Sequence, residues 1–129
     1  MTRTMAGAIA LLVATLTISV DARPLKPDQE AKIKPAGKAI ACIQIRSIQS
    51  SRVRDDRTID FYMSGRKVYR NSLPYKCSGL GFEESFAYST SLSQLCSVDT
   101  ITVLHSGSSG TNGPTCGLGK FQPITGAPR

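Results

Sequence analysis

The chain has 129 residues, with 16 Lys and Arg against 9 Asp and Glu, one His, four Cys and no Trp, so its formal net charge is +7. This length suits one small domain, and 40% hydrophobic with 19% charged residues is typical of a globular protein and not of a disordered or fibrous one. One His and four dispersed Cys leave little material for metal clusters or imidazole catalysis, which excludes most familiar enzyme classes.

The N-terminal segment, residues 1–22, has the pattern of a secretory signal peptide. Arg3 makes its start positive, and an uncharged apolar run follows from residue 5 to residue 20. The run is short for a membrane span, and the small Ala22 suits a signal peptidase site. We expect cleavage after Ala22 and a mature chain that is periplasmic or extracellular and lacks a transmembrane segment. An uncleaved N-terminal anchor is the alternative.

The next segment, residues 23–38, contains three Pro and four Lys, and its only large aliphatic side chains are Leu25 and Ile33. Such a composition buries too little apolar surface to order itself, so the sequence predicts a flexible tether. Residues 126–129 predict a loose tail in the same way. The folded unit is then residues 39–125, which is small enough for covalent cross-links to matter to its stability.

Short runs of alternating or β-branched residues follow one another through this unit, separated by turn-forming residues. We expect strands at residues 40–48, 58–63, 67–70, 87–90, 100–104 and 119–124. In the second of these runs, Ile59, Phe61 and Met63 occupy alternate positions and are expected to face inward. A change of phase in the first run predicts a bulge or bend near Arg46.

The connections between these runs are also readable. Polar clusters at residues 55–57 and 64–66 predict tight turns, the first of which closes a hairpin. Residues 82–86 predict one helical turn, and the Gly- and Ser-rich residues 106–114 predict an exposed loop. The expected fold class is therefore all-β: a small barrel or sandwich of about five to six short strands with one short helical turn, stapled by two disulfides.

The cysteines form an even set in a chain expected to be exported: Cys42, Cys77, Cys96 and Cys116. In an oxidising compartment an even set predicts two disulfides. Three pairings are open. The pairing of Cys77 with Cys96 and Cys42 with Cys116, which joins a local loop and the two ends of the domain, is our expectation. No two of these cysteines have the close spacing of a zinc motif, so we expect no metal and no cofactor.

No catalytic constellation is recognisable in the sequence. His105 would need a neighbouring carboxylate to act as a base, and a surface histidine is the more common case. Asp55 with Asp56, and Glu83 with Glu84, are adjacent residues, which point to opposite faces of an extended segment. There is neither a G-x-S-x-G elbow nor a phosphate-binding loop. We therefore expect a protein that is not an enzyme, with a hydrolase based on His105 as a distant alternative.

Basic residues are concentrated between positions 46 and 76, where acidic residues are few. Two of them, Arg52 and Arg54, share a face if their segment is extended, and hairpin pairing would bring the strand at 67–70 beside them. Such a face attracts polyanions, which in an exported compartment are lipid head groups, lipopolysaccharide phosphates or wall polymers more than nucleic acid. A face that only keeps the protein soluble is the alternative. The candidate anion-binding residues are Arg46, Arg52, Arg54, Arg66 and Arg70.

The spacing of residues from Cys42 to Ile124 resembles that of a family of small exported four-cysteine proteins of proteobacteria, known as a domain of unknown function. The matching elements are Cys42-Ile43, Val53-x-Asp55-Asp56-x-Thr58-Ile59-x-Phe61, Val68-Tyr69-Arg70-Asn71-x-Leu73-Pro74-x-x-Cys77-x-Gly79-Leu80, Phe86-x-Tyr88, Leu95-Cys96-x-x-Asp99-x-Ile101-x-Val103 and Cys116-Gly117-Leu118-Gly119-x-Phe121-x-Pro123-Ile124. They cover nearly the whole folded unit, although Ser78 stands where the pattern has Pro. The resemblance implies an exported four-cysteine scaffold, and it implies no activity, cofactor or catalytic residue.

Two function hypotheses follow from the sequence. The first is a non-enzymatic envelope or secreted protein that binds an anionic envelope component through its arginine-rich face. The second is a small secreted inhibitor, or protein-binding module, that acts on a hydrolase and contacts it through the loop at 106–114. Binding through the basic face is sensitive to salt, because salt screens exposed charges. Tight capture of one protein partner persists in high salt.

Overall fold

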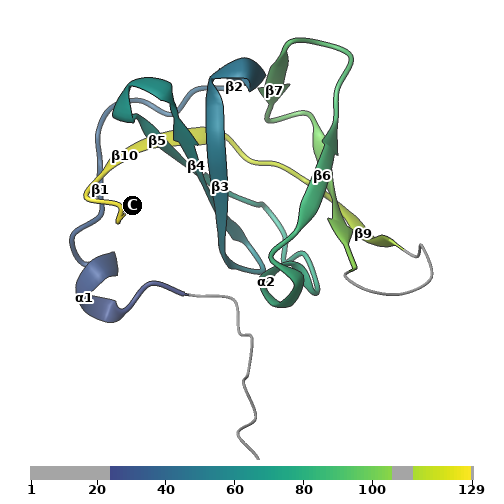
Figure 1. Cartoon of the computed structure of the whole chain (residues 1–129), viewed down its shortest axis with the longest axis horizontal. Helices are drawn as coiled ribbons and strands as arrows, with labels where there is room; N and C mark the ends of the chain where they lie inside the picture. Colours follow the sequence, from purple (N-terminus) through teal and green to yellow (C-terminus); the bar gives the residue numbers. More distant parts are fainter. Residues whose placement is uncertain (1–23, 106–111, 129) are drawn as a thin grey trace, which may run out of the picture.

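The structure, a computed structural model, describes residues 24–105 and 112–128 (Figure 1). The described residues form ten strands, two four-residue α-helices and two 3-10 turns, and the predicted all-β fold is confirmed. The strands are arranged in antiparallel sheets of five, three and two strands. There are more strands than expected because several have only two or three residues, which is too short to produce an alternating pattern.

The five-stranded sheet contains the hairpin that the sequence predicted. In order across the sheet, its strands are β1 (Lys34–Pro35), β10 (Phe121–Thr125), β5 (Val68–Ser72), β4 (Thr58–Met63) and β3 (Ile48–Asp55). The β3–β4 connection is the predicted polar turn, and the β4–β5 connection is the 3-10 turn η2 (Ser64–Arg66). In η2, Gly65 and Arg66 have positive φ angles of 79° and 64°, which allow the chain to reverse.

The remaining elements form two smaller sheets and the connections between them. The three-stranded sheet has the order β6 (Phe86–Ser89), β8 (Thr100–Leu104) and β9 (Asn112–Gly117). The two-stranded sheet pairs β2 (Cys42–Gln44) with β7 (Gln94–Cys96). The other elements are the helices α1 (Pro27–Glu30) and α2 (Leu80–Glu83) and the 3-10 turn η1 (Ile45–Ser47).

Local predictions are partly confirmed by these boundaries. The bend expected near Arg46 is η1, which divides the expected strand at 40–48. The helical turn expected at 82–86 begins earlier, in α2, because Phe86 pairs with Val103 and starts β6. Of the loop expected at 106–114, residues 112–114 belong instead to β9, where pairing with β8 supplies backbone partners; residues 106–111 lie outside the described residues.

The main core gathers side chains from all three sheets and from α2. Ile59, Phe61 and Met63 face it and are at most 5% exposed, which confirms the predicted inward face of this strand. The Phe61 ring meets Phe121 and Phe86 edge-on, with centroid distances of 5.6 and 6.2 Å. Since one fully buried aromatic or aliphatic side chain contributes about 1.5–3 kcal/mol, this cluster is the main source of the domain's stability.

The other face of the five-stranded sheet is covered by the two ends of the described chain (Figure 1). A second apolar cluster lies there, formed by Tyr62, Val68, Ile124, Ile33 and Ala127. Residues 24–38, which the sequence predicts to be a tether, contain α1 and β1, and Ile33 among them packs on this face. The tail also packs through residues 127–128. Composition alone misses this order, because both segments gain their partners only from distant strands.

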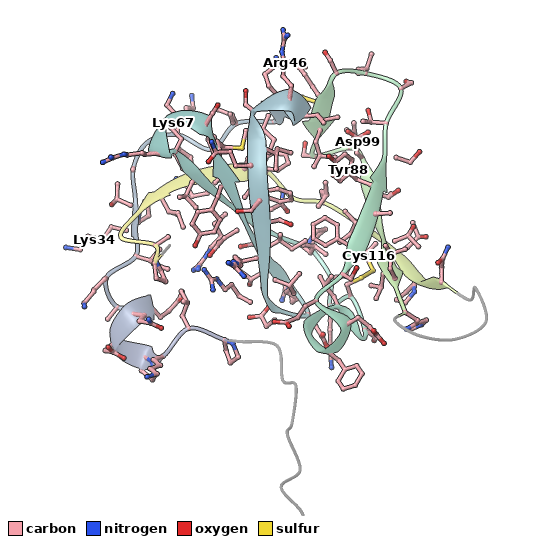
Figure 2. All side chains as sticks on the ribbon, viewed as in Figure 1. Lys34, Arg46, Lys67, Tyr88, Asp99 and Cys116 are labelled. Carbon is pink, nitrogen blue, oxygen red and sulfur yellow. A yellow bond between two sulfur atoms is a disulfide. The ribbon has the colours of Figure 1, made fainter. Side chains whose placement is uncertain are left out.

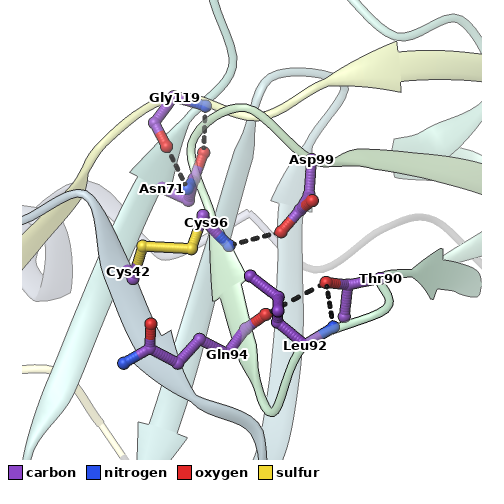
Figure 3. The surroundings of a disulfide bond; sticks show 8 residues. All are labelled: Cys42, Asn71, Thr90, Leu92, Gln94, Cys96, Asp99 and Gly119. Atoms are coloured by element: carbon purple, nitrogen blue, oxygen red, sulfur yellow. Dashed lines mark hydrogen bonds between the residues drawn. A yellow bond between two sulfur atoms is a disulfide. The ribbon is translucent and has the colours of Figure 1, made fainter.

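The disulfide pairing also differs from the expectation. Cys42 is bonded to Cys96, and Cys77 to Cys116, with Cα–Cα distances of 4.0 and 5.9 Å. The first pair forms because β2 and β7 place the two residues directly opposite each other, as Figure 3 shows. The sequence does not reveal this pairing, because it depends on a register between strands that are far apart in the chain. Two disulfides suggest an oxidising, exported environment.

Near the first disulfide, a buried amide connects β5 to the segment before β10 (Figure 3). The Asn71 side chain donates to the Gly119 carbonyl oxygen at 2.7 Å and accepts from the Gly119 N–H at 2.8 Å. Asn71 is fully buried, and this pair of bonds satisfies its amide. An added Cβ on Gly119 would lie 2.2 Å from the carbonyl oxygen of Ser72, so the close approach requires glycine.

Candidate functional site

The five candidate arginines fall into two groups in the structure. Arg54 and Arg70 lie on the face of the five-stranded sheet that the chain ends cover, and their side chains are only 11% and 15% exposed. Arg46, Arg52 and Arg66 are exposed. The structure therefore brings together only part of the predicted face, and it assigns the other part to an internal ion-pair cluster.

This cluster is centred on Asp60, whose carboxylate is fully buried. Arg54 Nε donates to Asp60 Oδ2 at 2.9 Å, and Arg70 donates to both oxygens, from Nε at 2.8 Å and from Nη2 at 3.1 Å. A carboxylate removed from water is stable only when such partners surround it. Arg54 and Arg70 are therefore the counter-ions of Asp60, and this role restricts them as ligands for an external anion.

The same cluster connects the two chain ends to the sheet. Arg70 Nη1 donates to the Glu30 carboxylate of α1, Arg54 Nη2 donates to the Tyr62 hydroxyl at 2.8 Å, and that hydroxyl donates to the carbonyl oxygen of Pro128. The hydrogen bonds that Asp60 accepts raise the pKa of Arg70 above its usual value, and Glu30 adds to the rise, whereas burial opposes it. Arg70 is held as a cation between two carboxylates.

Sequence reasoning missed Asp60 as the centre of this cluster. A signal was present in the hairpin register: β4 places Asp60 directly between Arg52 of β3 and Arg70 of β5. An acidic residue flanked by arginines across two strand pairs is a favourable cross-strand arrangement. The sequence does not reveal this register, so it does not identify Asp60 as a partner of the arginines.

Four of the exposed cations lie at one end of the five-stranded sheet. Ile48, the first residue of β3, pairs with Met63, the last residue of β4, so the turns η1 and η2 that adjoin them lie at the same end. Lys34 of β1 also lies at this end. It pairs with Thr125 of β10, and the residue before Thr125, Ile124, pairs with Val68, which follows η2 closely. We call the exposed cations at this end the basic rim: Lys34, Arg46, Arg66 and Lys67.

Acidic residues belong to other parts of the described chain. Asp55 and Asp56 lie in the β3–β4 turn at the opposite end of the hairpin, and Asp56 Oδ1 accepts from the Gly81 N–H of α2 at 2.8 Å. The remaining described acids are in α1, in α2 and the residue after it, in the buried cluster and in the β7–β8 turn. Figure 2 shows Arg46 and Lys67 extending from the upper edge and Lys34 from the left side. Arg57 is exposed in the β3–β4 turn, and Lys76 Nζ lies 3.7 Å from Asp56 Oδ2, so this end of the hairpin carries charges of both signs, whereas η1, η2 and β1 contain no acidic residue.

The histidine lies beside a carboxylate, as the hydrolase alternative required. His105 Nδ1 is 3.0 Å from Glu83 Oε1, and the side chains are 39% and 11% exposed. A Cβ on Gly113 would lie 3.1 Å from His105 Nε2, so the outer ring nitrogen faces the backbone of β9. The pair joins α2 to the end of β8, which is a structural role that needs no substrate.

No group of three metal-ligating side chains occurs within residues 24–105 and 112–128, and both disulfides occupy all four cysteines. No helix in the described part of the chain is long and apolar enough to cross a membrane. Comparisons with protein-family models, with curated proteins and with solved structures find no match to this chain.

Proposed function

We propose that this protein is an exported, non-enzymatic β domain that binds a phosphate-bearing anionic component of the bacterial envelope through the basic rim. The observation that carries the proposal is that exposed cations from η1, η2 and β1 share one end of the sheet, while these three elements contain no acidic residue. Arginine and lysine side chains at such an end bind phosphate oxygens through charge-assisted hydrogen bonds.

Export in this proposal rests on two features. The pattern of residues 1–22 is that of a cleavable signal peptide, which lies outside the described residues. The two disulfides suggest an oxidising compartment. In that compartment the abundant anions are lipid head groups, lipopolysaccharide phosphates and wall polymers.

The proposal narrows the arginine face expected from the sequence. Arg54 and Arg70 neutralise Asp60, so they support the sheet that presents the rim and do not contact the ligand. Arg46 and Arg66 remain as contact residues, and Lys34 and Lys67 join them. Because these side chains are exposed, their attraction for a polyanion falls as ionic strength rises.

The test is retention of the oxidised mature protein on immobilised lipopolysaccharide, with dextran as a neutral matrix. The protein is expected to bind lipopolysaccharide at low salt and to elute by about 0.5 M salt, where the screening length is only a few Å. The R46Q/R66Q/K67Q variant is expected to bind at least ~10-fold more weakly, a change of about 1.4 kcal/mol or more.

A matched control removes the same charge elsewhere. Lys26, Lys76 and Lys120 are exposed and lie outside the rim, so the K26Q/K76Q/K120Q variant is expected to keep most of the retention. Equal losses in the two triple variants would show that only net charge matters. That result, or retention that does not change with salt, would contradict a binding site at the rim.

A further inference from the structure

Three cavities adjoin β3 along its length. The first, of about 660 Å³, is lined by Arg54 and Asp55 together with Phe82 of α2. The second, of about 560 Å³, lies between residues 51–54 of β3 and the chain ends, and its other lining residues are Pro24, Leu25, Gln29, Glu84 and Pro128. The third, of about 120 Å³, is lined by Gln49, Ser50, Arg52 and Tyr62, so the chain ends do not line the hollow beside residues 49–52.

β3 is an edge strand, so one side of its backbone has no strand partner. The neighbouring strand β4 shows which backbone groups of β3 point outward. The Met63 N–H of β4 donates to the Lys67 carbonyl oxygen at 2.8 Å, so the backbone groups of Met63 point towards β5. Backbone groups alternate in direction along a strand, so every second residue before Met63 also points towards β5. Tyr62 and Asp60 therefore bond towards β3, where they pair with Ser50 and Arg52. The N–H and C=O of the intervening residue, Ser51, point away from the sheet.

No described residue pairs with the outer edge of β3 at this point. Residues 49–52 are all exposed although their side chains alternate between the two faces of the strand, whereas nearly every residue of the neighbouring β4 is buried. Within the described part of the chain, no backbone hydrogen bond outside the sheets involves Ser51. An unpaired, exposed edge of this kind is a template for the addition of another strand.

The charges beside the edge select the kind of strand that it accepts. Arg52 makes no hydrogen bond or ion pair with any described residue, and it is exposed and lines the second and third cavities. The carboxylates of Asp55, Asp56 and Glu84 line the first two cavities, so the charge that favours an acidic partner is confined to the stretch of β3 around Arg52.

We propose that the β3 edge is a docking site for an extended acidic segment of a protein partner, which adds to the five-stranded sheet as a further strand. Backbone hydrogen bonds to Ser51 supply part of the affinity, and a carboxylate facing Arg52 supplies the preference for acidic sequences. This site is separate from the basic rim, and its occupancy does not depend on the proposed binding of envelope anions.

The test uses an eight-residue peptide of alternating Thr and Glu, acetylated and amidated, and two N-methylated forms of it. One form is N-methylated at its Thr residues and the other at its Glu residues. Because successive N–H groups of a strand point to opposite sides, the methyl groups of one form face β3 and those of the other form face solvent. Binding measured by calorimetry is expected to fall at least ~10-fold for one methylated form and to stay within about twofold for the other. Equal effects of the two forms, or no binding of the unmethylated peptide, would overturn the proposal.

Two substitutions locate the peptide on the protein. Ser51→Pro removes the outward N–H, and proline is tolerated on an edge strand where its nitrogen faces solvent, so the fold is expected to persist. Peptide binding is expected to fall at least ~10-fold in Ser51→Pro and to persist in Ser51→Thr. The R46Q/R66Q/K67Q variant is expected to bind the peptide through β3 as before. If that variant loses the peptide and Ser51→Pro keeps it, the rim and not the edge is the binding site.

Discussion

At the scale of single residues, Asp60 decides how the arginines are used. Its fully buried carboxylate sits between Arg54 and Arg70, so the two guanidinium groups that appeared free in the sequence are internal counter-ions. Glu30 adds a further partner to Arg70, but its side chain is 52% exposed. The buried and the exposed carboxylates are therefore expected to differ widely in their effects on stability.

Asp60→Asn is expected to lower the free energy of unfolding by about 3–5 kcal/mol, because it leaves two largely buried guanidinium groups without their shared counter-ion. Glu30→Gln, which breaks a half-exposed ion pair, is expected to cost about 0–1 kcal/mol. Urea denaturation followed by circular dichroism measures both. If the two losses were equal, Asp60 would not be the centre of the cluster.

At the scale of elements, the sequence predicted what depends on neighbouring residues. The alternation of Ile59, Phe61 and Met63 identified β4 and its buried face, and the phase change near Arg46 identified the bend at η1. β1, β7 and most of the register escaped, because strands of two or three residues carry no periodicity and are formed only by pairing with distant segments.

The candidate site was partly predictable for the same reason. Arg46 and Arg66 stand in local turns, and their exposure follows from the turn sequence. The role of Arg70 depends on a register that brings it beside Asp60, and the position of Lys34 depends on the pairing of β1 with β10. Local sequence located the cations, but only the tertiary pairing shows which of them are available to a ligand.

The contact between β5 and the segment before β10 gives a prediction at the same scale. Gly119→Ala places a methyl group 2.2 Å from the Ser72 carbonyl oxygen, so the backbone must move and weaken the Asn71 hydrogen bonds. The melting temperature is expected to fall, with a loss of about 1–3 kcal/mol. Gly117→Ala is the control, because no atom lies within 4 Å of its added Cβ. Equal melting temperatures for the two variants would contradict the close approach.

At the scale of the whole molecule, the two disulfides connect different parts of the core. Cys42–Cys96 joins β2 to β7 within the two-stranded sheet, and Cys77–Cys116 joins the segment before α2 to the three-stranded sheet. They enclose 54 and 39 positions of the chain. On the chain-entropy model each contributes about 4 kcal/mol, which is comparable with the whole stability of a domain this small.

Peptide mapping of the unreduced protein is expected to recover the linkages Cys42–Cys96 and Cys77–Cys116 and no others. A variant that replaces both members of either pair with Ser is expected to lose about 4 kcal/mol of stability, and full reduction is expected to unfold the domain. Recovery of a Cys77–Cys96 peptide from the native protein would contradict the arrangement of β2 beside β7.

The position of β10 has a consequence for when the domain can fold. β10 comes last in the chain, yet it lies between β1 and β5, and the covering of the second face is completed by the carbonyl group of Pro128. A chain that is synthesised from its N-terminus therefore lacks an interior strand of this sheet until residues 121–125 have appeared. The five-stranded sheet therefore closes only after residues 121–125 have been made, so its formation comes late in the synthesis of this domain.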